Sequence, residues 1–391
     1  MHHLYIIIFW ISLFLLFYGY LGYGVILTLI NSIKNGKSTL SSPAVTNTPE
    51  IAFLVAAYNE EDCIESKIIN TLELDYPNAN LHIYIITDGS TDKTVELSGR
   101  FPEVTVYHQP ERIGKLGSLQ RIIPGLKEDI MLFSDANCLL NKESLRHLVQ
   151  HFNDPLVGAV SGEKKVMKGN DAAATEGLYW KYESWLKNQD SLYYTMVGAA
   201  GELFCMRREL YEELPREIIL EDFVQSMKVC EKGYRVIYEK KAFASEAPSK
   251  SLSEEMERKI RICAGAFQSF RFIKFAFNPF YNGKVFFQFM SHRFIRWTIG
   301  PVALVLAFIS NFIVRNVNDI YSFLFAAQCI FYTIAFIGLL MSINKLKGGP
   351  AFIPMYFVLM NFAVFAGFFR FVNGSQSNVW KKAERKTALR E

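Results

Sequence analysis

The sequence predicts an α/β domain with a mainly parallel sheet, joined to transmembrane helices on both sides. Three observations support this prediction. Residues 50 to 265 alternate strand-like and helix-like runs, Leu4 to Ile30 carries no charge, and further apolar stretches follow in the C-terminal third. Half of the 391 residues are hydrophobic, and 33 residues are phenylalanine, which favours a membrane component.

The first apolar run, Leu4 to Ile30, is long enough to cross a hydrocarbon core, which needs roughly 20 apolar residues. Lys34 and Lys37 follow it, so the positive-inside rule places that end in the cytoplasm and the short start "MHH" outside. A cleavable signal peptide is the alternative, but the run is too long for one and no small-x-small cleavage site follows. We therefore expect one N-terminal transmembrane helix.

Three more candidate spans lie near Ile295 to Val314, Ile320 to Ile343 and Ala351 to Val372. Basic residues precede the first of these, and Lys345 and Lys347 follow the second, so both of those ends are predicted to be cytoplasmic. A full crossing by the third would put the basic tail "WKKAERK" outside, against the same rule. A re-entrant or interfacial helix is the alternative, and the sequence leaves both open.

The segment from Phe270 to Met290 is aromatic with a few cations, which is typical of a segment in the headgroup layer. A loose linker is the alternative. The predicted divisions of the chain are an N-terminal transmembrane helix (1–33), a linker (34–49), a cytoplasmic α/β domain (50–265), an interfacial amphipathic segment (266–293), a C-terminal transmembrane region (294–374) and a basic tail (375–391).

Composition argues against several other classes of protein. The six cysteines form no CxxC pair and no His/Cys cluster with zinc spacing, so we interpret them as reduced, mostly packed thiols of a cytoplasmic domain. The formal net charge is +4, and the basic residues are scattered or close to the predicted spans. We therefore predict no nucleic-acid partner.

Polar clusters follow the predicted strands of the α/β domain. Strands are expected at Ile51 to Ala57 and within "LHIYIITD", "VTVYH" and "IMLFS". The clusters "YNEE", "TDGSTD" and "SDAN" come where three of these strands end. In open α/β sheets the carboxyl ends of the strands form the edge that binds ligands, so the sequence predicts a ligand site there.

Two of these loops have features of a nucleotide site. Asp88 can accept hydrogen bonds from a ribose or a base edge, and Gly89 permits a tight turn with outward N–H groups, although many strand-to-helix turns look similar. Arg112 and Lys115 lie among glycines in "ERIGKLGSLQ", where a phosphate could approach the backbone. An ordinary surface loop is the alternative for this stretch.

Two pairs of polar residues suggest metal binding and base catalysis. Asp135 and Asn137 in "SDAN" offer the hard oxygen donors that Mg²⁺ or Mn²⁺ prefers, although Asp and Asn also favour plain turns. Glu221 and Asp222 open a predicted helix, where a carboxylate facing a sugar could act as a general base. Acids are also common in a first helical turn because they oppose the helix dipole.

The order of the motifs is recognisable as a whole. "VAAYNEE", "TDGSTD", "RIGKLGSL", "SDAN", "GAAGELFCMRR", "EDF" and "RKIRICAG" follow one another between about residues 50 and 270. This series resembles the membrane-bound family 2 glycosyltransferases, such as the cellulose, hyaluronan, chitin-oligosaccharide and poly-N-acetylglucosamine synthases. The resemblance implies an inverting transferase with a GT-A domain that binds a nucleotide sugar.

The resemblance assigns roles to particular residues. It implies that Asp222 is the catalytic base with Glu221 as its supporting neighbour, and that Asp135 and Asn137 bind Mg²⁺ or Mn²⁺. The residues implied for nucleotide-sugar binding are Ala57, Tyr58, Glu60, Asp88, Lys115, Asp135, Arg258 and Arg261. Those implied for the acceptor side are Gly198, Ala199, Ala200, Gly201 and Glu202.

Two positions depart from the family pattern. Asn137 stands where many relatives have a second Asp, so we expect a metal to bind more weakly or to depend more on the diphosphate. The Q-x-x-R-W motif of processive synthases corresponds here to "RKIRI" at residues 258–262, which keeps Arg261 but has neither the Gln nor the Trp. Contact with the diphosphate is still expected, and processivity is left open.

The resemblance implies transfer of a sugar from a UDP-sugar to a growing polysaccharide, by an integral protein of the cell membrane with a cytoplasmic catalytic domain. The alternative acceptor is a lipid or a polyprenyl phosphate that receives a single sugar. A non-enzymatic scaffold or transport subunit is less favoured, because a domain that only binds nucleotide has no need of Asp222. The expected partners are the UDP-sugar, a saccharide or lipid-linked acceptor, membrane lipid, and an accessory export subunit or a second copy.

Overall fold

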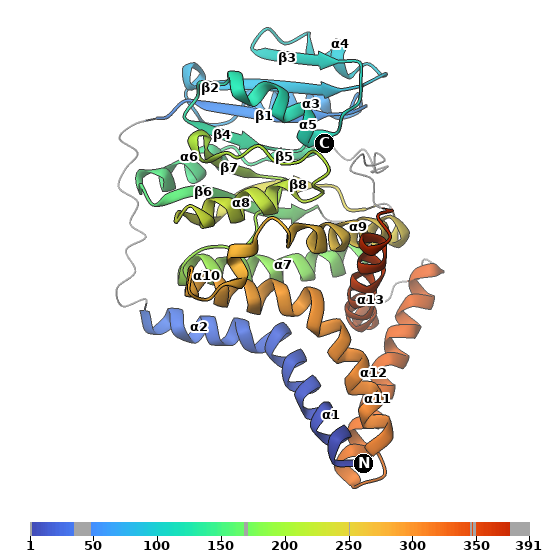
Figure 1. Cartoon of the computed structure of the whole chain (residues 1–391). Helices are drawn as coiled ribbons and strands as arrows, with labels where there is room; N and C mark the ends of the chain where they lie inside the picture. Colours follow the sequence, from blue (N-terminus) through green and yellow to red (C-terminus); the bar gives the residue numbers. More distant parts are fainter. Residues whose placement is uncertain are drawn as a thin grey trace.

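The computed structural model places an α/β domain at one end of the molecule, with long apolar helices extending from it (Figure 1). Lys37, Lys345 and Lys347, which served to orient the spans, and the basic tail beyond residue 375 lie outside the described residues. The structure describes residues 2–34, 48–167, 171–249, 251–344, 346 and 349–375, and only the backbone of helical residues 171–176 and 178.

In the described part of the chain, one sheet of eight strands has the order β3-β2-β1-β4-β7-β6-β8-β5. The neighbours β3, β2, β1 and β4 are parallel, as predicted, and β6 is parallel to β8. β7 runs antiparallel to β4 and β6, and β5 antiparallel to β8, so this half of the sheet is mixed. The strands are β1 Ile51–Ala57, β2 Leu81–Asp88, β3 Val104–Gln109, β4 Ile130–Phe133, β5 Cys138–Leu140, β6 Val157–Val166, β7 Phe204–Arg207 and β8 Arg235–Glu246.

Helices surround the sheet and connect its strands (Figure 1). Short 3₁₀ turns lie at Asn78–Asn80, Ile123–Gly125, Gln150–Asn153, Arg208–Leu210, Lys274–Phe277 and Gly349–Ala351. The α-helices of this domain and its junction with the apolar helices are α3 Ile64–Leu72, α4 Thr94–Ser98, α5 Lys115–Ile122, α6 Ser144–Val149, α7 Asp171–Tyr193, α8 Glu221–Glu231, α9 Leu252–Ser269 and α10 Gly283–Gln288.

The central strand β1 is buried on both faces. Its side chains alternate between two hydrophobic clusters, with Ile51, Phe53 and Val55 in one and Ala52 and Leu54 in the other. A strand covered on both sides must be apolar throughout, which explains the continuous apolar run from which it was predicted.

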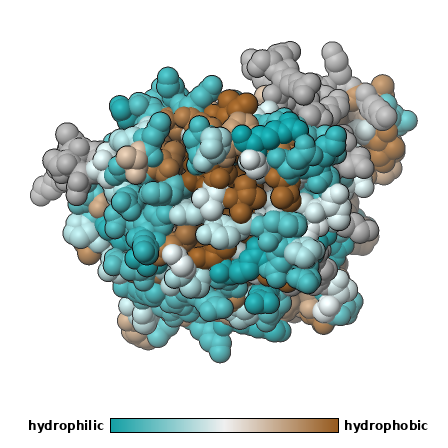
Figure 2. Space-filling view, turned by 90° about the horizontal axis from the view of Figure 1, so that it is seen from above, coloured by the Kyte–Doolittle hydropathy of each residue, from teal (hydrophilic) through white to brown (hydrophobic). Residues whose placement is uncertain are grey.

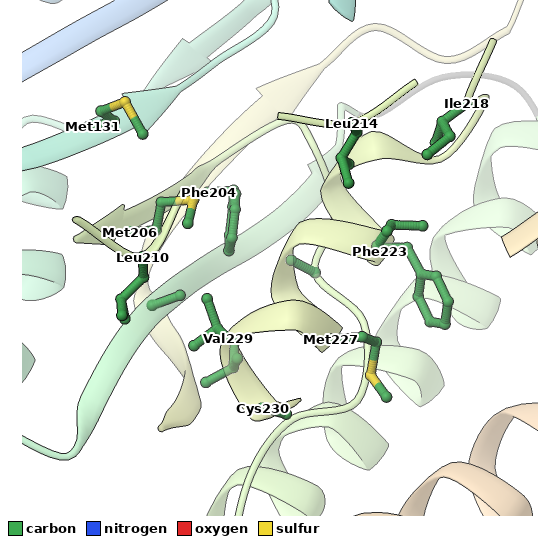
Figure 3. Packing of buried hydrophobic residues seen from close by; sticks show 14 of the residues in the cluster. Met131, Phe204, Met206, Leu210, Leu214, Ile218, Phe223, Met227, Val229 and Cys230 are labelled. Atoms are coloured by element: carbon green, nitrogen blue, oxygen red, sulfur yellow. The ribbon is translucent and has the colours of Figure 1, made fainter. Parts of the chain in front are cut away.

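Helix α8 packs against the second half of the sheet. Phe223, Met227 and Cys230 belong to the same cluster as Phe204 of β7 and Leu210, which follows it (Figure 3). This packing fixes the position of the first turn of α8, where Glu221 and Asp222 lie.

The cysteines agree with the prediction of unpaired thiols. All six are free. Cys63, Cys138, Cys205 and Cys230 are buried within the α/β domain, where a thiol packs as a small apolar group.

Four helices are long and apolar enough to cross a membrane, which matches the predicted layout of one N-terminal and three C-terminal candidates. They comprise His2–Lys34, Gly283–Val314, Asp319–Ile343 and Gly349–Val372. The last of these contains α13 (Phe352–Val372), a continuous helix. Their orientation across a membrane stays a prediction.

The predicted N-terminal transmembrane helix bends in the structure. Helix α1 (His2–Phe17) extends away from the α/β domain, and a π-helical turn at Tyr18–Gly22 leads into α2 (Tyr23–Lys34), which runs along the base of the domain (Figure 1). Gly24 allows this approach, because a Cβ there would lie 2.4 Å from the Trp185 ring on α7. Only part of His2–Lys34 therefore points away from the domain.

The predicted interfacial segment, 266–293, packs partly on the α/β domain. Phe275 and Phe289 belong to its hydrophobic core, whereas Phe280 is 96% exposed. The apolar helix Gly283–Val314 includes α10, a π-helical stretch at residues 289–299 and α11 (Gly300–Val314), so no break occurs at the predicted boundary after residue 293. Location of this segment in the headgroup layer stays a prediction.

The end of the α/β domain that points away from the long helices is mostly hydrophilic, with apolar side chains gathered near its middle (Figure 2). The long helices, by contrast, expose many large apolar side chains, such as Leu4, Phe14, Phe323 and Phe369. This division suits a domain in water attached to helices in a membrane.

Candidate active site

The polar clusters meet at one edge of the sheet, as predicted. β1 pairs in parallel with β2, so that Ala57 lies opposite Thr87, and with β4, so that Leu54 lies opposite Phe133. The residues that follow these strands therefore leave the sheet on the same side.

The loops after β1 and β2 are joined to each other by hydrogen bonds. The Asn59 N–H donates to Ser90 Oγ at 3.1 Å, and the Thr91 N–H donates to Asn59 Oδ1 at 2.8 Å. The Glu60 N–H donates to Thr94 Oγ1 at 2.7 Å. Asn59 has a φ of +54°, a left-handed conformation that Asn tolerates. The expected nucleotide-binding loop is thus held in place by its neighbour.

Asp88 shapes the next loop. Its two carboxylate oxygens accept hydrogen bonds from the Ile113 N–H at 2.8 Å and the Gly114 N–H at 2.7 Å. The Arg112 guanidinium lies 3.4 Å from the centre of the Tyr58 ring, a cation–π contact. Tyr58, Asp88 and Arg112 therefore come together, while direct contact between Asp88 and a nucleotide stays a prediction.

Lys115 links the metal candidate to the acidic pair. Its Nζ lies 2.9 Å from Asp135 Oδ1 and 3.2 Å from Glu221 Oε1. Burial alone would lower the pKa of Lys115, but Asp135, Glu221 and Asp222 outweigh it and raise the pKa above its usual value. Lys115 is therefore a permanent cation between the carboxyl end of β4 and the start of α8.

Asp222 has the environment of a general base. Burial and the neighbouring Glu221 raise the pKa of Asp222 to about 7, although Lys115 and a hydrogen bond from the Phe223 N–H to Oδ1 oppose this shift. A Cβ at Gly201 would lie 3.2 Å from Asp222 Oδ2 and 3.4 Å from Lys115 Nζ. The backbone of the predicted acceptor loop thus reaches both groups, and a carboxyl with this pKa can take up a proton at neutral pH.

The rest of the acceptor loop is fixed against α8 and the sheet. Gly198 has a φ of +92°, and a Cβ there would lie 2.3 Å from the Phe223 ring. The Ala199 N–H donates to Ser226 Oγ at 3.0 Å, while Ala200 is half-buried. Glu202 accepts a hydrogen bond from Lys164 at 2.5 Å. Burial alone would raise the pKa of Glu202, but Lys164 outweighs it, so the pKa lies well below its usual range.

The two predicted arginines of α9 differ in their surroundings. Arg258 pairs with Glu255 at 3.0 Å. Burial lowers the pKa of Arg261. Glu221, and then Asp135 among other groups, opposes this effect, so Arg261 lies within the electric field of these acids. Arg261 therefore interacts electrostatically with the acidic pair, and Arg258, besides its pair with Glu255, interacts in the same way with Glu202.

Residues 49–265, more than half of the chain, match a family described as "Glycosyltransferase like family 2". The chain belongs to this family, the family 2 glycosyltransferases. The resemblance found in the sequence is thereby confirmed.

Two curated relatives of this family 2 glycosyltransferase have different acceptors in their names. A β-monoglucosyldiacylglycerol synthase from Nostoc is 31% identical over 163 residues, covering 40% of this chain and 34% of the relative. A poly-β-1,6-N-acetyl-D-glucosamine synthase from Staphylococcus aureus is 27% identical over 225 residues, covering 55% of this chain and 54% of the relative. The matches thus span about a third and about half of these relatives.

A solved structure has the same fold over nearly the whole chain. The mannosyltransferase PcManGT from Pyrobaculum calidifontis, in complex with GDP-Man and Mn²⁺, covers 94% of this chain and 100% of its own, with a TM-score of 0.72 and 20% sequence identity. At this identity the likeness concerns the fold, which is the predicted GT-A fold with its apolar helices.

The donor set of this family 2 glycosyltransferase fits a metal that is shared with a substrate. Among the described residues, no three His, Cys, Asp or Glu side chains gather as a metal-binding group. Asp135 retains 36% exposure of its side chain, and Asn137 supplies an amide oxygen two residues later. Mg²⁺ is commonly bound by one or two carboxylates with substrate phosphates completing the shell, so Asp135 and Asn137 would hold it together with a diphosphate.

The sequence analysis missed Lys67, which lies directly beneath the "SDAN" turn. Its Nζ donates to Ser134 Oγ at 2.7 Å and to the Cys138 carbonyl at 2.8 Å, and the residue is completely buried. Burial lowers the pKa of Lys67 to about 8. The helical period could have revealed it, because position 67 lies on the same face of α3 as Ile64 and Ile68.

Proposed function

We propose that this protein transfers a sugar from a UDP-sugar to an acceptor hydroxyl, with inversion at the anomeric carbon. The observation that carries the proposal is the half-buried Asp222 carboxyl, whose pKa is about 7, beside the Lys115 bridge to Asp135. A base beside a cation is the pair of groups that such a transfer needs for its acceptor and its leaving group, which supports the proposal.

The proposed reaction is an in-line displacement. Asp222 takes the proton from the acceptor hydroxyl as that oxygen forms a bond to the anomeric carbon, and the bond from this carbon to the diphosphate oxygen breaks. The negative charge then rests on UDP. Lys115 and Arg261, which interact with the acids of the site, would stabilise this charge electrostatically. A bound Mg²⁺ or Mn²⁺ would add positive charge at the diphosphate.

Two acceptors have support. A growing polysaccharide is the acceptor that the sequence motifs implied. The likeness to the poly-N-acetylglucosamine synthase supports it. A lipid is supported by the likeness to the β-monoglucosyldiacylglycerol synthase and by an apolar groove described below. Labelled product from membranes separates the two, because a polymer gives a ladder of sizes and a glycolipid gives one species in the organic phase.

A panel of sugar nucleotides tests the proposed function. Purified full-length protein in lipid nanodiscs is incubated with single UDP-sugars and with GDP-mannose, and release of the nucleoside diphosphate is measured. We expect release from one UDP-sugar that is stimulated by added acceptor. Binding of these nucleotides without release from any of them would instead indicate a protein that only binds its ligand.

A further inference from the structure

An apolar groove runs between two of the helices that can cross a membrane. Its volume is about 510 Å³, and Ile11 and Leu15 of α1 lie on one wall, with Phe294, Val302 and Leu306 on the other. Both walls belong to long apolar helices, His2–Lys34 and Gly283–Val314. In a bilayer such a groove faces hydrocarbon, so an acyl chain is the occupant that its chemistry favours.

The length of the groove suits one leaflet. Its wall extends from Phe294 to Leu306, which at about 1.5 Å per residue is roughly 18 Å. Half of the hydrocarbon core of a bilayer is about 15 Å thick. A lipid chain from the leaflet next to the α/β domain can therefore lie along the whole groove.

The end of the groove nearest the domain leads to the proposed base. Phe294 contacts Phe270, with ring centroids 5.8 Å apart. Phe270 stacks on Trp297 at 6.4 Å, and Trp297 lies 5.2 Å from Phe223, the residue that follows Asp222. A continuous set of aromatic side chains thus extends from the groove to Phe223, the residue next to Asp222.

Several cations near the acceptor side are already paired with carboxylates. Lys164 pairs with Glu202 at 2.5 Å, and Lys259 pairs with Glu255 at 3.5 Å. Arg296 pairs with Glu183 at 2.5 Å, and Arg293 pairs with the same carboxylate at 3.2 Å. The Arg293 Nε–H also donates to the Val197 carbonyl at 3.0 Å. A phosphate headgroup would compete with these carboxylates, whereas a hydroxyl-bearing, uncharged headgroup would not.

We propose that the acceptor is a lipid with an uncharged headgroup, whose acyl chain lies in this groove while a headgroup hydroxyl reaches Asp222. The inference rests on the proposed function and names the acceptor class for the same site. The packed rings of Phe294, Phe270, Trp297 and Phe223 lie between the groove and Asp222, and the headgroup would lie along them.

Two matched substitutions on one helix test the inference. Val302 lines the groove and is 47% exposed, whereas Val305 is 45% exposed and lies outside its lining. Full-length protein is placed in phosphatidylcholine nanodiscs with dioleoylglycerol and the UDP-sugar that supports UDP release. We expect Val302→Trp to lower kcat/KM for dioleoylglycerol by roughly tenfold or more, because the indole displaces several methylenes of the chain. Val305→Trp should stay within about twofold of the parent.

A second wall and a donor measurement separate the groove from general damage. Ile11→Trp on α1 should have the same effect as Val302→Trp, and both variants should bind the UDP-sugar with the parent's affinity. Equal rates for Val302→Trp and Val305→Trp would overturn the inference, as would a preference of the parent for polyprenyl phosphate or a soluble oligosaccharide over dioleoylglycerol. Absence of UDP release by the parent from every donor would overturn the proposed function, and this inference with it.

Discussion

At the scale of single residues, the proposed chemistry depends on how Asp222 is ionised. Burial and Glu221 raise the pKa of Asp222 from its ordinary value of 3.8 to about 7. A protonated carboxyl cannot accept the acceptor's proton, so activity must rise as pH increases through this value. The base is therefore active over the upper part of the physiological range.

The pH profile of kcat tests this account of Asp222. We expect an acid limb with a midpoint near pH 7. Since Glu221 helps to raise the pKa of Asp222, Glu221→Gln should move the limb to lower pH by roughly one unit. A limb that stays in place in Glu221→Gln would show that another group titrates.

A separate prediction concerns the role of Asp135 in metal-dependent binding of UDP. In Asp135→Ala the only acidic side chain of the "SDAN" turn is lost, so UDP binding in the presence of Mn²⁺ should weaken roughly tenfold or more. Calorimetry with and without Mn²⁺ measures this. Asp75→Ala, which removes a carboxylate paired with Arg146, is the matched control. Equal UDP affinities for Asp135→Ala and the parent would refute a metal role.

The sequence predicted individual site residues better than their contacts. The place of Asp88 and Asp135 at one edge of the sheet was predictable, because the ends of parallel strands share that edge. The contact of Lys115 with Glu221 was not predictable, because it depends on how α8 packs across the mixed half of the sheet. Lys67 was missed because a lysine in an apolar helical face is ordinarily taken as exposed.

At the scale of elements, the position of α9 depends on α13. A Cβ at Gly367 of α13 would lie 2.5 Å from Cys263 Cβ and 2.9 Å from the Ile260 carbonyl oxygen, both on α9. Arg261 lies between these two contacts in the sequence. The close approach of the two helices thus holds Arg261 near the acidic pair.

A side chain at Gly367 should therefore disturb both packing and activity. We expect Gly367→Val to destabilise the protein by about 1–3 kcal/mol, the usual cost of overpacking, and to lower kcat by moving Arg261. Phe369→Val, at a 62% exposed position of the same helix, is the control. Thermal unfolding and UDP release measure the two effects, and a fully active Gly367→Val would contradict the role of this contact.

The apolar helices were only partly predictable from sequence patterns. Their composition predicted where they occur, because long uncharged runs are distinctive. The bend at Tyr18–Gly22 and the continuity of Gly283–Val314 were not predictable, since hydropathy indicates where apolar residues lie and not the path of the backbone. Contacts with the α/β domain, such as Gly24 against Trp185, decide these features.

At the scale of the whole molecule, the long apolar helices border the proposed catalytic site. Trp297 of the helix Gly283–Val314 contacts Phe223 beside the proposed base, and Arg293 of the same helix binds the Val197 carbonyl ahead of the acceptor loop. The α/β domain and the apolar helices are thus joined at the acceptor side of the site. An acceptor that arrives from the bilayer would meet both.

The central claim is that Asp222 is the general base of a sugar transfer. Its most direct test compares kcat and UDP-sugar affinity of Asp222→Asn with those of the parent in nanodiscs. We predict that kcat falls by roughly 10² to 10⁴, the range typical of a lost general base, while the dissociation constant of the UDP-sugar stays near that of the parent. Full activity in Asp222→Asn would contradict the claim.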